Sequence, residues 1–154
     1  MSEALPAGSA VDPAGGDWFL QRLVRLANVT GVEIGITLTV GGSIISGELT
    51  GGREYFEAVA EQVRSAVPGE VGEAMSDFFR KGAKVYVLAK EETNEVSVDL
   101  IPPNYLHLRN AKHFAPGSEA MPSGDGMWWR GRIAEVSGFT VGSLGPRPPA
   151  DPAE

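Results

Sequence analysis

The sequence of 154 residues contains no cysteine, and its other shortages are equally informative. Without cysteine, disulfides, thiol catalysis, iron–sulfur clusters and cysteine-ligated zinc sites are all excluded. No apolar run approaches the ~20 residues that a membrane-spanning helix needs. The first 16 residues lack both the basic end and the apolar stretch of a secretory signal. We therefore expect a cytoplasmic protein that does not enter the membrane.

Positive charge is also in short supply. Thirteen Lys and Arg residues oppose twenty Asp and Glu residues, which gives a formal net charge of −7 and a pI near 4.9. An acidic chain repels the phosphates of nucleic acids and the headgroups of anionic lipids. The composition therefore predicts that neither nucleic acid nor membrane is a partner.

Residues and motifs that carry chemistry are scarce. The two histidines, His107 and His113, are six residues apart, so a continuous strand would face them the same way and hold them ~20 Å apart. That distance is too long for a shared metal ion, and we expect both side chains to be partly exposed. The sequence has no nucleophile elbow, no H-E-x-x-H, no P-loop and no G-x-G-x-x-G. We therefore predict that the protein is not an enzyme and needs no cofactor.

The central part of the sequence has periodically spaced apolar residues, and the two terminal segments do not. Many of the glycines and prolines fall in the two terminal segments, neither of which can hold a periodic apolar face. We predict a disordered N-terminal tail over 1–16, a single folded domain over 17–145 and a disordered C-terminal tail over 146–154.

Three segments have the apolar spacing of helices. Asp17 is a good N-cap for a helix over 18–28. Two further helices are predicted over 53–67 and 70–81, the first ended by Pro68-Gly69 and the second by Gly82.

The remaining patterned segments predict strands. Apolar residues alternate over 32–40, Gly41-Gly42 supplies a two-residue turn, and 43–49 returns as the second strand of a hairpin. Gly47 indicates a bulge or bend in that return strand. Further strands are expected over 84–89, 96–100 and 105–110, and a closing hairpin over 127–136 and 139–144 is joined at Ser137-Gly138.

The order of these elements predicts an α+β fold. It consists of a bent antiparallel sheet or a small barrel, with an N-terminal helix and a two-helix insertion. A barrel of this kind would be similar to the Sm-like architecture, a likeness that says little about function.

Two adjacent tryptophans suggest an interaction face. Neighbouring strand residues point to opposite faces, and Trp129 shares its face with Met127 and Ile133, so we place it in the core. Trp128, Arg130 and Arg132 share the other face, where two guanidinium groups could stack on an exposed indole. An exposed Trp beside Arg has the composition of a binding hot spot. The alternative is that a helix covers this face and Trp128 belongs to the core.

Four stretches occur in an order that points to one family. They are the hairpin over 36–47, the helix start Arg53-Glu54-Tyr55-Phe56, the strand over 106–112 and the segment over 128–142, which contains the run W-R-G-R-I-A-E-V-S-G-F. Together they resemble the gas vesicle accessory protein U family (GvpU). The likeness covers 32–144 but leaves the segment 82–103 and both tails unmatched.

This resemblance implies a non-enzymatic cytoplasmic protein that serves gas vesicles, the air-filled protein shells that give cells buoyancy. It implies an organising or clustering role through self-association, with the vesicle shell or other gas vesicle proteins as partners and no cofactor. One alternative is an Sm-like module that binds nucleic acid or forms a protein ring, which the bent hairpin and the basic strand over 109–112 favour and the net charge opposes. A small enzyme with an unrecognised site is the third.

Overall fold

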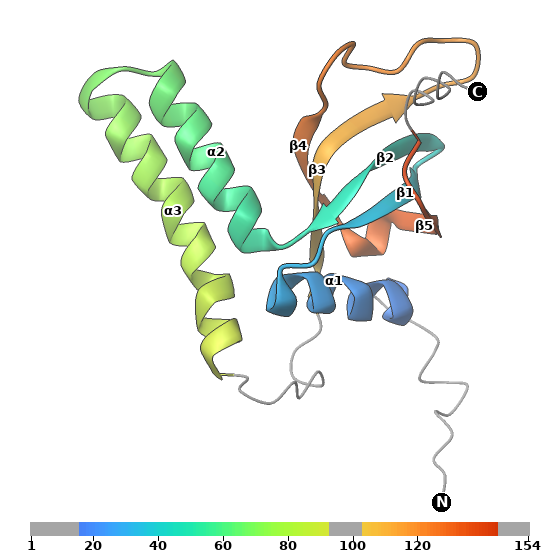
Figure 1. The fold of residues 1–154 in the computed structure, drawn as a ribbon, viewed down its shortest axis with the longest axis horizontal. Helices are drawn as coiled ribbons and strands as arrows, with labels where there is room; N and C mark the ends of the chain where they lie inside the picture. Colours follow the sequence, from blue (N-terminus) through green and yellow to red (C-terminus); the bar gives the residue numbers. More distant parts are fainter. Residues whose placement is uncertain (1–15, 93–102, 145–154) are drawn as a thin grey trace, which may run out of the picture.

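The computed structural model describes residues 16–92 and 103–144 and confirms the α+β class. Figure 1 shows a curved sheet above one helix, with two further helices projecting to its side. The predicted strand over 96–100 lies outside the described residues, as do both predicted tails apart from Gly16. The described elements, in chain order, are α1 (Trp18–Thr30), β1 (Ile34–Val40), β2 (Ser43–Thr50), α2 (Gly52–Ala66), α3 (Gly69–Glu92), β3 (Tyr105–Phe114), β4 (Met127–Arg132), a short 3-10 turn (Ile133–Glu135) and β5 (Val136–Val141).

The N-terminal helix begins where the sequence predicts and ends two residues later, at Thr30 rather than Asn28. A carboxylate oxygen of Asp17 accepts a hydrogen bond from the backbone N–H of Phe19 at 2.8 Å, which satisfies a donor that the helix itself leaves unpaired. At the other end Gly31 has a φ of +76°, a left-handed conformation that glycine adopts without steric cost.

The predicted hairpin is also confirmed. Strands β1 and β2 pair from Ile34 opposite Leu49 to Val40 opposite Ser43. Gly41 and Gly42 form the turn with φ values of +57° and +83°. Positive φ at both central residues is the requirement of a type I′ turn, which matches the twist of the flanking strands.

The five described strands form one antiparallel sheet in the order β4-β3-β2-β1-β5. The sheet is open, because β4 and β5 are its edges and do not pair, so the bent sheet forms and the closed barrel does not. The predicted closing hairpin is therefore wrong. β4 pairs with β3 and β5 pairs with β1 at the opposite edge.

Ile133 explains why no hairpin forms. Its side chain is fully buried, and its backbone N–H bonds to the carbonyl of Asn104 at 2.9 Å. The 3-10 turn that starts at Ile133 ends β4 and carries the chain to the other edge of the sheet. Burial of this one isoleucine is favourable by about 1.5–3 kcal/mol. This gain favours ending β4 at Ile133 over extending it into a hairpin with β5.

One face of the sheet forms the core with α1. The helix contributes the fully buried side chains of Leu20, Val24 and Ala27, and Phe19 stacks on Phe139 of β5 with ring centroids 6.4 Å apart. β1 and β2 present alternate residues to this core, as the period of two predicts. The sheet and turn residues buried here are Ile36, Leu38, Ile45, Leu49, Leu106, Leu108, Ala111, Ile133 and Val136.

The second inserted helix is longer than the sequence predicts. We expected it to end at Gly82 before a strand over 84–89, but α3 continues to Glu92. The reason is packing against α2. A Cβ at Gly82 would lie 2.6 Å from the ring of Phe56, so glycine is needed for close approach within the helix and does not end it. Ala83 and Tyr86 then extend the stripe that faces α2, and this burial outweighs the strand preference of Val85 and Tyr86.

This packing predicts that side-chain volume at Gly82 is not tolerated. Gly82→Leu should lower the free energy of unfolding by about 1–3 kcal/mol, because the added atoms overlap Phe56. Lys81→Leu, at an exposed position of the same helix, should change it by less than about 0.5 kcal/mol. Urea denaturation followed by circular dichroism measures both. Equal stability of the two variants would contradict the close helix–helix contact.

Candidate interaction surfaces

A bulge in β3 shapes the sheet face opposite α1. Its register with β2 shifts between Ser46 and Glu48, where two residues of β3 oppose Gly47, and the backbone of Asn110 has a φ of +55°. Gly47 fits opposite this bulge, because a Cβ there would lie 2.9 Å from the carbonyl oxygen of Arg109. The sequence predicts an irregularity at Gly47, but the extra residue belongs to β3, and β2 keeps a regular register with β1.

The bulge turns the two histidines to opposite faces. His107 pairs with Thr50, whereas His113 pairs with Ile45, which belongs to the core face. The expectation of one shared face is therefore wrong, because a bulge shifts the alternation of a strand by one residue. The expected partial exposure is also wrong for His107, which is fully buried.

The two tryptophans lie on opposite faces, as their adjacency predicts. Trp129 pairs with Leu108 and packs against the core cluster. Trp128 lies on the other face, where it is half-buried rather than exposed. The start of α2 covers part of this face, since the ring of Tyr55 meets the indole of Trp128 edge-on at 6.4 Å.

Arg109 is the arginine that stacks on Trp128. Its guanidinium carbon lies 5.9 Å from the centre of the indole, within the range of a cation–π contact. The same guanidinium forms an ion pair with Glu33 at 3.2 Å. The sequence indicated Arg130 and Arg132 for this role. It does not reveal that β4 pairs with β3 in a register that brings Arg109 next to Trp128.

A polar groove of about 550 Å³ opens beside this pair. Three carboxylates and one guanidinium line it, so its formal charge is −2 (three negative, one positive). An aromatic side wall with charged donors and acceptors suits a protein partner. The lining residues are Glu33, Glu48, Arg109, Asn110, Asp125, Gly126 and Trp128.

Arg130 is held on the same face by aromatic rings and a buried histidine. Its guanidinium carbon lies 3.9 Å from the ring centre of Tyr105 and 5.3 Å from that of Phe56. Its Nη1 lies 2.7 Å from Nε2 of His107. Since arginine only donates hydrogen bonds, Nε2 is the acceptor and a neutral His107 carries its proton on Nδ1.

Arg132 lies at the end of β4 and is exposed. It hydrogen-bonds to the hydroxyl of Tyr105, and this bond together with the positive charge holds the pKa of Tyr105 below its usual range. The predicted face therefore contains two adjoining clusters, Trp128 with Arg109 and the pair Arg130 and Arg132 with Tyr105.

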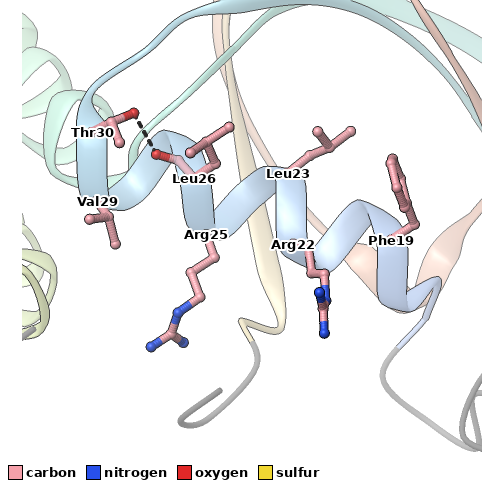
Figure 2. Close-up of a pocket in the computed structure, with 7 residues that line it drawn as sticks. All are labelled: Phe19, Arg22, Leu23, Arg25, Leu26, Val29 and Thr30. Atoms are coloured by element: carbon pink, nitrogen blue, oxygen red, sulfur yellow. Dashed lines mark hydrogen bonds between the residues drawn. The ribbon is translucent and has the colours of Figure 1, made fainter. Parts of the chain in front are cut away.

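A second surface lies on the outer side of α1. An apolar groove of about 240 Å³ runs along the helix, and all of its lining residues belong to the segment 19–30. Figure 2 shows Phe19, Leu23 and Leu26 on one side of the helix, with Arg22 and Arg25 on the other. Phe19 is 49% exposed and Leu26 is 45% exposed. The apolar spacing of this segment favours a helix packed on its own core and is also compatible with a membrane-surface or partner-groove helix. The core interpretation is confirmed for Leu20, Val24 and Ala27.

Over residues 16–92 and 103–144, no group of three or more His, Cys, Asp or Glu side chains is placed to hold a metal ion. Within the same residues, no helix has the length and apolarity needed to cross a membrane.

The environment of His107 predicts a loss of stability in acid. Burial, and then the charge of Arg130, lower the pKa of His107 from 6.5 to about 3. As the pH falls below about 6.5, the unfolded chain binds a proton that the folded protein excludes, so stability decreases. Between about pH 7.5 and pH 5 this group should cost about 2 kcal/mol.

His107→Gln keeps an acceptor for Arg130 but does not titrate, so its loss of stability over this range should be about 2 kcal/mol smaller than that of the unchanged protein. His113→Gln is the control and should behave like the unchanged protein. Urea midpoints at the two pH values measure the difference. If His107→Gln is as acid-sensitive as the unchanged protein, His107 is not the responsible group.

The comparisons with known proteins give the family. No curated protein and no solved structure matches the chain. A family model described as "Gas vesicle protein GvpU-like" matches residues 17–144, which include all the described helices and strands and both surfaces described above. The chain therefore belongs to the GvpU-like family of gas vesicle proteins.

Proposed function

We propose that this protein is a non-enzymatic cytoplasmic accessory protein that organises or clusters gas vesicles, and thereby supports buoyancy, through self-association. Membership of the GvpU-like family is the observation that carries the proposal. The partners are then the vesicle shell or other gas vesicle proteins together with further copies of this chain.

A clustering protein must connect at least two particles, so it needs more than one contact surface. The described part of the chain offers surfaces on separate elements, namely the Trp128 groove on the sheet and the apolar groove on α1. Figure 1 places β4 and α1 in different parts of the molecule. This separation supports a role in which one protein contacts a vesicle and another copy at the same time.

We assign the vesicle contact to the face of Trp128, Arg130 and Arg132. Half-buried aromatic side chains that are already held in place lose little conformational freedom on binding. Trp128 is held by Arg109 and Tyr55, and Arg130 is held by Tyr105 and His107. These supports give the face a defined shape before a partner arrives.

Substitution of Trp128 tests this assignment. Trp128→Ala should cost about 1 kcal/mol of stability, because it removes one edge-on ring contact and one cation–π contact. It should weaken vesicle binding about tenfold or more, as expected of a hot-spot residue. Since gas vesicles float, the measurement is the fraction of added protein recovered with the floating vesicles after gentle centrifugation.

The matched control is Trp18→Ala, because Trp18 is also half-buried and also has an arginine, Arg22, 5.5 Å from its ring. It should leave recovery unchanged. If Trp128→Ala binds vesicles as the unchanged protein does, the face is not the vesicle contact.

The Sm-like alternative of nucleic-acid binding has less support. Phosphate neutralisation by basic residues supplies most non-specific affinity, and the net charge of −7 opposes it. Two of the arginines on the sheet have other partners: Arg109 pairs with Glu33, and Arg130 contacts His107 and Tyr105.

We therefore expect no useful affinity for nucleic acid. The purified protein should have the absorbance ratio of protein alone and should not retard mixed RNA at physiological salt. Binding tighter than about 1 μM, which is stronger than typical non-specific affinity, would favour the Sm-like alternative. A basic single-stranded-RNA-binding protein serves as the positive control.

A further inference from the structure

The inserted helix α3 carries an apolar stripe that α2 does not cover. Four large apolar side chains on it are exposed, by 65% at Val71, 43% at Met75, 72% at Phe78 and 64% at Val85. Their spacing of four, three and seven residues is that of a coiled-coil seam. The seam position skipped in the last interval is Gly82, which packs against Phe56 of α2. The stripe extends over about 21 Å of helix.

The intramolecular contacts of α3 use a neighbouring stripe. Gly72, Ser76 and Ala83 are buried, and Phe79 and Tyr86 are half-buried. The last four of these residues lie four, seven, eleven and fourteen positions after Gly72. All five therefore lie on one face of the helix, beside the exposed stripe. About half of the circumference of α3 is thus apolar, and the helical hairpin uses only part of it.

The charges beside the stripe are divided into an acidic and a basic segment. The acidic residues Glu70, Glu73 and Asp77 come first and the basic residues Arg80, Lys81 and Lys84 follow, and these six side chains are exposed. Lys90, Glu91 and Glu92 lie in the sequence of α3 beyond the end of the stripe. Two such helices side by side attract one another when they run antiparallel, because each acidic segment then meets a basic segment. A parallel pair would place like charges together.

We propose that this stripe, Val71, Met75, Phe78 and Val85, is the surface through which two copies of the chain associate, with their α3 helices antiparallel. The seam spacing supplies the apolar contact, and the divided charge identifies a second copy as the complementary partner. Burial of large apolar side chains from both copies supplies the free energy, and the charges set the orientation.

This association deepens the proposed function and rests on it for its biological role, although dimerisation itself is independent of vesicles. The stripe lies on the helical hairpin, whereas Trp128 lies on β4. A pair joined through α3 therefore carries two Trp128 faces, which is the valency that linking two vesicles requires.

The first experiment measures the mass of the purified full chain in the absence of vesicles. The unchanged protein should be a dimer by size-exclusion chromatography with light scattering. Phe78→Lys should raise the dissociation constant at least about tenfold. The matched control is Met121→Lys, because Met121 is also strongly exposed, at 67%, but lies in the loop after β3. Circular dichroism verifies that both variants remain folded.

A charge exchange tests the complementarity. One variant carries Glu70→Lys, Glu73→Lys and Asp77→Lys, and a second carries Arg80→Glu, Lys81→Glu and Lys84→Glu. Each variant alone should be monomeric, since both segments then have the same sign. An equimolar mixture of the two should form dimers again. Dimers of either variant alone would overturn the electrostatic part of the proposal.

The absence of native cysteine allows a direct test of orientation. Single-cysteine variants Val71→Cys and Val85→Cys should form little disulfide alone, because antiparallel helices hold two copies of either position well apart. A mixture of the two should form the 71–85 cross-link. Efficient cross-linking of either variant with itself would indicate a parallel pair and overturn the proposal.

The two proposals fail in different ways. A protein that is monomeric at all concentrations, yet floats with vesicles, overturns the α3 contact and leaves vesicle binding intact. A protein that dimerises through α3 but does not float with vesicles overturns the vesicle contact alone. If the dimer persists in Phe78→Lys, another surface joins the copies and the α3 assignment is wrong.

Discussion

Burial of one face of a curved sheet by α1 is the constraint on which the rest of the structure depends. Leu20 and Val24 from the helix and Leu38 and Leu108 from the strands are all fully buried in the same cluster. Each such side chain contributes about 1.5–3 kcal/mol, and this apolar contact is what holds the open sheet together. Ile133 completes the cluster, and its burial forces the chain to leave β4 and cross to the other edge. The positions of both edge strands, and so of Trp128, follow from this requirement.

The opposite face of the sheet is organised by polar and aromatic contacts instead. There the start of α2 and the middle of α3 meet the strands around His107, whose ring lies 4.8 Å from that of Tyr55 and 5.7 Å from that of Tyr86. An amide oxygen of Asn28 accepts a hydrogen bond from the N–H of Gly52 at 2.9 Å and connects α1 to this region. The helical hairpin is thus fixed at its base, and its remaining length projects away from the sheet (Figure 1).

This arrangement places three candidate contact surfaces on separate elements. The sheet supplies a polar groove with an aromatic wall, the outer side of α1 supplies an apolar groove, and α3 supplies an apolar seam with divided charge. Because these features lie on different elements, occupation of one does not sterically require loss of another. A protein with no recognisable catalytic motif can still have specific functions when its surfaces are distributed in this way.

Local patterns in the sequence determined the elements whose signals are local. Asp17 and Gly31 bound α1, Gly41-Gly42 sets the hairpin, and the alternation through Trp128 and Trp129 assigns them to opposite faces. Even the family was indicated by short runs such as W-R-G-R-I-A-E-V-S-G-F, and the match over 17–144 bears this out.

Only the tertiary structure decided features that depend on contacts between distant residues. The sequence predicts a helix end at Gly82, but in the structure Phe56 packs on this glycine within the helix. The sequence predicts a turn at Ser137-Gly138, but burial of Ile133 in the core ends the strand earlier. The contact of Arg109 with Trp128 likewise depends on the pairing of β4 with β3, and the burial of His107 depends on helices from another part of the chain. No local pattern encodes such pairings, because their free energy comes from groups that meet only after the chain has folded.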